Sequence, residues 1–193
     1  MSKVVLEMTV SLDGYSAGPD IGPDEPLGRG GEQLHDWMFG GTPAEAEALQ
    51  MEKFANVGAV IVGRRMADLG IGNWGDEPVF HAPVFVITHR PAEAIVKDGG
   101  TSYTFVTDGI EAALERAREA AGTQDIHLGG GAEIARQFLN AGLVDEVQLH
   151  ISPLILGGGQ RLFDGVDPGI RLVLQDAGSD RGATHLVFGV ERE

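Results

Sequence analysis

The sequence contains no cysteine among its 193 residues. This absence excludes a disulfide framework, a thiolate zinc site and a cysteine nucleophile, and it is compatible with the cytoplasm. Long apolar runs are missing as well, since no window approaches the ~18 apolar residues of a membrane-spanning helix. Glu7 interrupts the apolar start of the chain, which is too short and too polar for a signal peptide. We therefore predict a soluble, cytoplasmic protein that binds no membrane.

Basic residues are scarce. The chain has 14 Lys and Arg against 29 Asp and Glu, which gives a formal charge of −15. Such a surface repels nucleic acid, because nucleic-acid binding depends on neutralising phosphates with Lys and Arg. An anionic ligand therefore needs a local basic pocket, for which Arg64, Arg65, His89 and Arg90 are the candidates. The alternative for each is a solvated side chain at a loop tip.

Two chemical signatures are absent. The six histidines include no i, i+4 pair, so we predict no metal site. No G-x-S-x-G motif is present either, which argues against covalent hydrolysis. Redox chemistry, if the protein performs any, must come from a cofactor.

The length and composition favour a single domain over residues 1–193. The apolar fraction is 42% and the charged fraction 22%, near the averages for globular proteins. Glycine is abundant: 29 of the 193 residues are glycine, well above the usual share of ~7%. Many loops of this chain therefore use a permissive backbone.

Apolar runs and helical patterns alternate along the chain, which is typical of an open α/β sheet. The patterns predict eight strands, at 4–10, 57–62, 83–87, 103–106, 126–128, 147–151, 170–175 and 184–190. They predict helices at 42–56, 108–121 and 132–140. A capping box at Thr42 and Glu45 opens the first, and Asp108, with Glu111 three residues later, is the predicted cap of the second. We expect a mixed, mostly parallel sheet flanked by helices, with a C-terminal antiparallel hairpin that turns at residues 178–180.

The most informative motif is a triple glycine, Gly129-Gly130-Gly131, between a short strand and a helix that begins at Ala132. Glycines let backbone N–H groups approach a ligand closely, and the first turn of the helix adds unpaired donors and a partial positive charge. Two basic turns, at residues 63–66 and 88–90, also follow apolar runs. Because ligands bind beyond the carboxyl ends of parallel strands, we expect one phosphate-binding edge. The alternative is that the glycines only permit a tight turn.

Five segments in order resemble the dihydrofolate reductase superfamily, and in particular the reductase domain of riboflavin biosynthesis proteins. They are T-V-S-L-D-G-Y at 9–15, V-G-R-R-M at 62–66, V-I-T-H-R at 86–90, L-G-G-G-A at 128–132 and P-L-I-L-G-G-G at 153–159. The resemblance spans nearly the whole chain. It implies a dihydrofolate reductase-like fold with an eight-stranded sheet, and NADPH as the cofactor.

The resemblance also implies roles for particular residues around that cofactor. Thr88, His89 and Arg90 would hold the adenosine 2′-phosphate, which suits a bidentate arginine. The complete set of implied cofactor residues is Leu12, Gly14, Gly63, Arg64, Arg65, Met66, Thr88, His89, Arg90, Gly129, Gly130, Gly131, Ala132 and Glu133.

Substrate and proton-donor roles rest on fewer residues. Asp13 and Asp36 are the candidates to supply or relay a proton, although Asp13-Gly14 is also a turn signal and Asp36 is also compatible with a solvated helix carboxylate. Trp37, Trp74 and Gly158 are candidate substrate contacts, with core or loop packing as the alternative for the two tryptophans. The long segment from Ser11 to Gly31 could close over the site.

The predicted function is that of an NADPH-dependent reductase acting on a ribosylaminopyrimidine or pteridine-like substrate. The alternatives are dihydrofolate reductase activity and a non-catalytic NADP(H)-binding protein, and a purely structural domain would leave the clustered arginines without a use. Riboflavin-type relatives imply a homodimer. The strand with alternating Val147, Leu149 and Ile151 is a candidate for its contact, although pairing within the chain explains the same pattern.

Overall fold

A computed structural model describes residues 2–191. The strands are β1 (Val4–Ser11), β2 (Tyr15–Ala17), β3 (Val57–Gly63), β4 (Pro83–Ile87), β5 (Ile95–Val96), β6 (Ser102–Val106), β7 (Asp125–Gly130), β8 (Glu146–Ser152), β9 (Gln160–Arg161), β10 (Arg171–Asp180) and β11 (Ala183–Glu191). The helices are η1 (Gly31–His35), α1 (Asp36–Phe39), α2 (Pro43–Phe54), α3 (Arg64–Gly70), η2 (Asp98–Gly100), α4 (Ile110–Ala121) and α5 (Ala132–Asn140). Within residues 2–191, no helix is long and apolar enough to cross a membrane.

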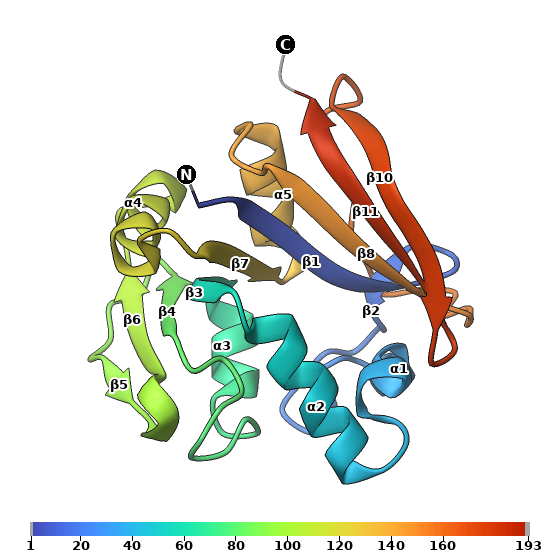
Figure 1. Ribbon diagram of the computed structural model, residues 1–193, viewed down its shortest axis with the longest axis horizontal. Coiled ribbons are helices and arrows are strands. Elements are labelled where there is room, and N and C mark those ends of the chain that lie inside the picture. The colour runs from blue at the N-terminus through green and yellow to red at the C-terminus, as the bar shows by residue number, and fades with distance from the viewer. Residues whose placement is uncertain (1, 192–193) are drawn as a thin grey trace.

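The main sheet has nine strands in the order β10-β11-β8-β1-β7-β3-β4-β6-β5 (Figure 1). The strands from β8 to β6 pair in parallel, whereas β10, β11 and β5 add antiparallel edges. The predicted α/β class, with its mostly parallel sheet and C-terminal hairpin, is confirmed. The eight predicted strands are all present. Sequence patterns missed β5 and the small β2-β9 ribbon, because strands of two or three residues show no periodicity.

Helices cover both faces of the sheet, and the apolar cluster beneath the helices differs in size between the two faces. On one face, α4 and α5 pack on an apolar core that includes Leu6, Ile61 and Leu128. On the other face, α3 packs on a smaller cluster that includes Val62 and Val86. Because neighbouring residues of a strand point to opposite faces, each buried strand contributes to both layers.

Two local expectations at helix starts had different outcomes. Thr42 and Glu45 form the predicted capping box of α2, with Pro43 at its first position. The predicted cap of α4 by Asp108 is wrong: Gly109 is the N-cap, with φ 95° and no capping side chain. Asp108 instead lies 3.3 Å from Arg116 in an exposed ion pair.

Two further expectations are corrected. The hairpin turns after Asp180 rather than at residues 178–180, because β10 continues to that residue. The strand expected to offer a dimer contact, β8, is interior, paired with β1 on one side and β11 on the other. Pairing within the chain therefore explains its alternating pattern, and the edges of the sheet are β10 and β5.

Close packing of α4 on β3 depends on Gly58. A Cβ atom there would lie 2.7 Å from Cα and 2.8 Å from the carbonyl oxygen of Ala121, which are backbone atoms that cannot turn aside. We expect Gly58→Ala to lower the free energy of unfolding by about 1–3 kcal/mol, the usual cost of overpacking. Urea unfolding measures this. The control is Gly178→Ala, whose added Cβ meets no heavy atom within 4 Å; an equal effect of both substitutions would contradict the packing argument.

Candidate active site

Three parallel strands end together at one edge of the sheet. Val62 of β3 is in register with Gly130 of β7, and Gly63 is in register with Ile87 at the end of β4. The structure thus brings together the triple glycine and the two basic turns that the sequence singled out. The edge has the position at which open α/β sheets bind ligands.

The triple glycine leads directly into α5. The peptide bond between Gly130 and Gly131 is cis, and Gly131 is the N-cap of α5 with no side-chain hydrogen bond to the first turn. A Cβ at Gly131 would meet no heavy atom within 4 Å, so this backbone faces open space. The arrangement has the room and the amide donors that a phosphate group needs.

Glu133, a predicted cofactor residue in the first turn of α5, is engaged within its own helix. Its carboxylate accepts hydrogen bonds from Gln137 at 3.1 Å and from Arg136 at 2.8 Å. These two bonds, with Gln137 the larger influence, hold the pKa of Glu133 below its ordinary value. An ionised carboxylate beside a phosphate site is unfavourable by itself, but Arg136 offsets this charge.

Arg64 and Arg90 meet at a shared carboxylate. Asp68 accepts from Arg64 Nε at 2.6 Å and from Arg90 Nη2 at 3.0 Å. Arg64 also donates to the carbonyl oxygen of Arg90 at 3.1 Å and lies over the ring of Phe105 at 5.0 Å. The side chain of Arg90 is 71% exposed even in this ion pair, so an anion from solvent can reach it.

The turn after β4 is stabilised by Thr88. Its buried hydroxyl accepts a hydrogen bond from the backbone N–H of Arg90 at 3.0 Å, an ST-type turn that fixes the direction of the chain. His89 and Arg90 are exposed beyond it. Met66, another predicted cofactor residue, is partly buried against the cluster beneath α3, and its contact with a cofactor stays a prediction.

Basic side chains continue along this edge to β9. Arg65 hydrogen-bonds Gln160, and Arg161 lies over the ring of Tyr15 at 4.7 Å. Arg136 donates to the carbonyl oxygen of Arg161 at 3.5 Å. Five of the fourteen Lys and Arg residues are therefore linked along or beside the edge, namely Arg64, Arg65, Arg90, Arg136 and Arg161. In a chain with a charge of −15, these five arginines concentrate positive charge near one edge of the sheet, and their binding of an anion stays a prediction.

Asp13 ties together two loops next to this edge. Its carboxylate accepts from Ser11 Oγ at 2.5 Å, from the N–H of Leu156 at 3.1 Å and from the N–H of Gly157 at 2.8 Å. The bond from Ser11, followed by those from the two amides, lowers the pKa of Asp13. An ionised carboxylate is a poor proton donor, so this geometry favours a positioning role; proton transfer by Asp13 stays a prediction.

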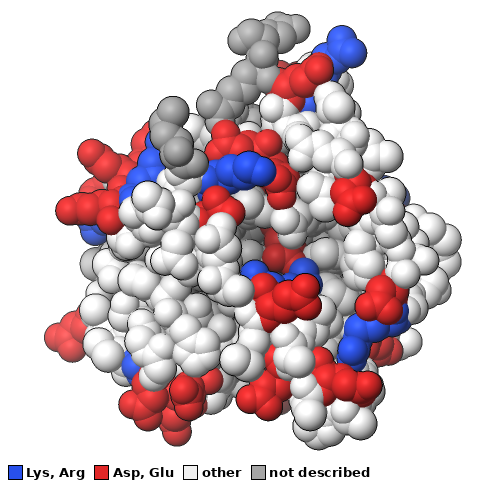
Figure 2. Space-filling model, viewed as in Figure 1, with Lys and Arg blue, Asp and Glu red and all other residues white. Residues whose placement is uncertain are grey.

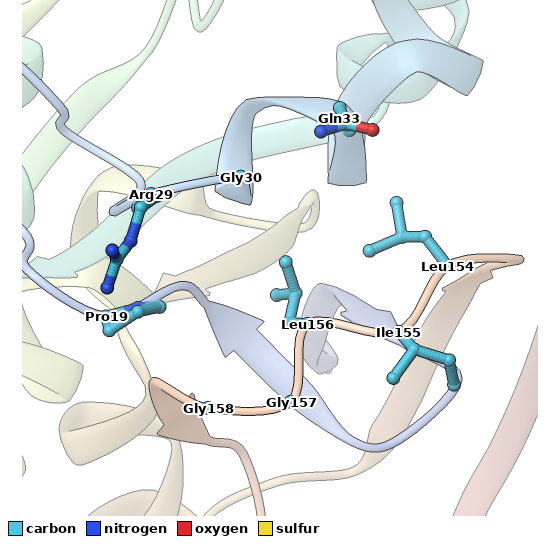
Figure 3. A pocket seen from close by; sticks show the side chains of 9 residues that line it. All are labelled: Pro19, Arg29, Gly30, Gln33, Leu154, Ile155, Leu156, Gly157 and Gly158. Atoms are coloured by element: carbon cyan, nitrogen blue, oxygen red, sulfur yellow. The ribbon is translucent and has the colours of Figure 1, made fainter.

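A pocket of about 450 Å³ lies beside these loops (Figure 3). Its lining consists of Pro19, Arg29, Gly30, Gln33 and the segment Leu154–Gly158. Gly158, a predicted substrate contact, is part of that lining. Leu12 and Gly14 lie on the neighbouring loop, where the N–H of Leu12 donates to the carbonyl oxygen of Leu154 at 2.9 Å.

The remaining predicted residues lie elsewhere. Asp36 is exposed at the start of α1. Trp37 is buried and donates to Thr9 Oγ1 at 3.3 Å. Trp74 packs edge-on to Phe80 in the cluster beneath α3, at a ring distance of 5.1 Å. Both tryptophans thus have packing contacts within the chain, and their contact with a substrate stays a prediction.

Sequence reasoning missed a buried polar cluster on the sheet face beneath α2. Glu7 of β1 accepts a hydrogen bond from His150 Nε2 at 2.8 Å and forms an ion pair with Lys53 of α2, and its other oxygen lies 3.4 Å from His127 Nδ1. His150 Nδ1 lies 2.7 Å from Nδ1 of His185. We call Glu7, Lys53, His127 and His150 the Glu7 cluster. The sequence signal that could have revealed this cluster is the presence of one titratable residue in each of three strands: Glu7, His127 and His150.

Opposing influences set the charges of the Glu7 cluster. Burial alone would raise the pKa of Glu7, but the bond from His150 and the nearby His127 and Lys53 hold it well below its ordinary value of 4.5. Burial lowers the pKa of His127 and of His150 below 6.5, although Glu7 acts in the opposite direction on both. Near neutral pH, the cluster therefore contains an ionised Glu7 and two neutral imidazoles.

The Glu7 cluster is not completely sealed. The side chains of Glu7 and His127 are each 11% exposed, and that of Lys53 is 15% exposed. Within α2, Ala46 is the one residue that is buried, so the helix covers this face without an apolar seal. Figure 2 shows a hollow in the middle of the view with acidic and basic atoms gathered in it, and Figure 1 draws α2 below β1 and β8 in the same view. Within residues 2–191, no group of three or more metal-ligating side chains is disposed to hold a metal ion.

The fold and the site together define a class of protein: an open α/β sheet with glycines and arginines gathered where three parallel strands end. The profile of the RibD C-terminal domain family matches residues 2–188. The chain therefore belongs to that family, and its fold is dihydrofolate reductase-like. Membership supports a reductase of the riboflavin-pathway type.

Two curated relatives come from Bacillus subtilis (strain 168). The uncharacterized protein YyaP is 26% identical over 180 residues, which cover 88% of this chain and 85% of YyaP. The uncharacterized protein YwjB is 33% identical over 171 residues, which cover 83% of this chain and 82% of YwjB.

Solved structures share the fold. A protein from Shewanella sp. PV-4, named for riboflavin biosynthesis, has a TM-score of 0.74 at 22% identity, with both chains covered completely. RibD of Acinetobacter baumannii has a TM-score of 0.66 at 17% identity, covering 100% of this chain and 59% of that one. Dihydrofolate reductase of Enterococcus faecalis, complexed with NADP(H), has a TM-score of 0.61 at 14% identity, covering 98% and 97%.

The Glu7 cluster makes stability dependent on pH in a defined direction. A lowered folded-state pKa means that the unfolded chain binds more protons, so stability falls on acidification. We expect His127 and His150 to cost stability as the pH falls below 6.5, and Glu7 to do so below 4.5. Urea unfolding at several pH values measures both steps. In Glu7→Gln the lower step should shrink, and an unchanged acid limb would contradict the assignment.

Proposed function

We propose that this protein is an NADPH-dependent reductase that transfers a hydride to a ribosylaminopyrimidine or pteridine-like substrate, in the manner of 5-amino-6-(5-phosphoribosylamino)uracil reductase. The observation that carries the proposal is the edge where β3, β4 and β7 end together, with glycines and arginines at their tips. The family and the NADP(H) complex of the Enterococcus faecalis structure support the cofactor.

The residues at this edge fit the charged parts of NADPH. Amides at Gly131 and in the first turn of α5 have no side-chain cap and face open space, which suits the pyrophosphate. The guanidinium of Arg90, exposed and placed beside Arg64, suits the 2′-phosphate, because arginine forms bidentate bonds with phosphate. A Cβ at Gly63 would lie 2.8 Å from Cγ1 of Ile134, so glycine there lets the end of β3 pack against α5.

Hydride transfer asks little of the protein beyond orientation and exclusion of water, since the reduced nicotinamide supplies the hydride when it is bound. The carboxylate of Asp13 fixes the loop after β1 against the loop after β8. This contact holds Leu12, whose side chain is 67% exposed, at the rim of the proposed nicotinamide site. Burial of that side chain on ligand binding would remove water from the reacting atoms.

The 2′-phosphate contact predicts a preference between cofactors. Arg90→Ala should lower the affinity for NADPH at least tenfold and leave the affinity for NADH nearly unchanged, because a charged hydrogen bond contributes about 1.5–3 kcal/mol. Fluorescence titration with both nucleotides measures this. The matched control is Arg118→Ala, which removes an exposed arginine from α4. If the wild-type protein binds neither nucleotide, the proposed function is wrong. If it binds NADPH but does not oxidise it in the presence of any of the substrates, a non-catalytic NADP(H)-binding protein is favoured.

Asp68 should oppose cofactor binding. It holds the side chains of both Arg64 and Arg90, and its negative charge lies where the 2′-phosphate would come. We expect Asp68→Asn to raise the NADPH affinity about threefold to fivefold, since an exposed ion pair contributes up to about 1 kcal/mol. Asp108→Asn is the control, because it breaks a similar exposed pair with Arg116 on α4. A fall in affinity in Asp68→Asn would place the phosphate elsewhere.

A further inference from the structure

One ring nitrogen of the Glu7 cluster is left without a partner. His127 Nδ1 faces Glu7 Oε2 at 3.4 Å, and the ring packs edge-on against Phe54 at 5.2 Å. Among residues 2–191, no group hydrogen-bonds to Nε2 of His127. This nitrogen is not among the buried side-chain atoms that lack a partner, so it is open to solvent and a ligand can reach it.

The neighbouring Gly129 leaves this nitrogen uncovered. Residues 127 and 129 of β7 point to the same face of the sheet, the face beneath α2. A Cβ at Gly129 would lie 3.3 Å from His127 Nε2 and 3.4 Å from its Cδ2. The backbone of Gly129 is not in the left-handed region, so the local conformation alone does not call for glycine. What the missing side chain provides is room in front of Nε2, at the start of the proposed cofactor edge.

The charge of Glu7 decides what His127 Nε2 offers. A carboxylate accepts hydrogen bonds only, so it favours the tautomer of His127 that carries its proton on Nδ1. Burial keeps the imidazole neutral near pH 7, because it lowers the pKa of His127. Nε2 is then a lone-pair acceptor. Lys53 is already paired with Glu7, so no free cation is present there to attract an anion.

We propose that Nε2 of His127 is a specificity-determining hydrogen-bond acceptor, which selects a nitrogen heterocycle bearing a ring N–H group. Glu7 is the positioning residue that fixes the tautomer. This inference rests on the proposed function, because it takes the room in front of Gly129 as the place where substrate meets cofactor. The ligand class follows from an acceptor in a cluster whose charged groups are already paired: a neutral donor fits, and an anion does not.

The test uses two probes that differ in their donors. 5,6-Diaminouracil carries ring N–H groups, and its 1,3-dimethyl derivative has both of them replaced. Isothermal titration calorimetry gives the dissociation constant of each, with and without saturating NADP⁺. We expect the wild-type protein to bind 5,6-diaminouracil about tenfold more tightly, the usual worth of one hydrogen bond. Equal affinities, or binding of neither probe, would overturn the proposal.

Variants separate recognition from folding. His127→Phe should abolish the preference between the probes, whereas His127→Gln, whose amide oxygen can accept at a similar position, should keep part of it. Glu7→Gln should reduce the preference, since a neutral amide no longer fixes the tautomer. Gly129→Ala should weaken the binding of 5,6-diaminouracil by filling the space before Nε2, and Gly178→Ala, in open space on β10, should not. A preference that survives His127→Phe would contradict the inference.

NADPH titration of the same variants distinguishes the two proposals. If the wild-type protein binds no NADPH but its preference between the probes still depends on His127, the proposed function fails and the acceptor role stands. If NADPH binds and the preference does not depend on His127, the reductase proposal stands and this inference fails. Unfolding curves of His127→Phe and His127→Gln show whether either variant is folded, and the wild-type comparison of the two probes needs no variant.

Discussion

The parallel pairing of β7 between β1 and β3 is the constraint on which the rest of the structure depends. Pairing with β3 brings Gly130 beside Val62, so the triple glycine ends at the same edge as the basic turn after β3. Pairing with β1 places His127 opposite Val5, on the face that also carries Glu7. Register in a sheet fixes both the position along the strand and the face. One set of backbone hydrogen bonds therefore positions the proposed phosphate-binding edge and the Glu7 cluster together.

Because register assigns each residue to one face, the two faces of the sheet differ in the side chains they bury. Beneath α4 and α5, the face is apolar and contributes most of the buried core. Beneath α2, the Glu7 cluster replaces apolar packing with an ion pair and two imidazoles. Taking these groups out of water is costly, and mutual pairing offsets much of that cost. A polar interior of this kind is weak evidence for stability, and its alignment with Gly129 and the proposed cofactor edge is the basis of the ligand recognition that we propose.

Much of the fold could be predicted from the sequence. The eight longer strands follow from apolar runs, and the capping box at Thr42 and Glu45 marks the start of α2. Short elements such as β5 and α1 were missed, because two to four residues show no period. The cap expected at Asp108 failed, since a glycine with positive φ turns the chain there instead. The grouping of Gly129–Gly131 with the basic turns was predicted correctly, because parallel strands end at the same edge.

The sequence by itself determined the class of fold, the acidic surface with few cations, and the glycines and arginines at the strand ends, because these depend on local pattern and composition. Tertiary structure alone decided which partners those residues have. Asp68 joins Arg64 to Arg90, Asp13 holds the amides of Leu156 and Gly157, and Glu7 gathers Lys53, His127 and His150. These partners are separated by up to 144 positions in the chain. Contacts at that range arise from strand order and register, which no local pattern encodes.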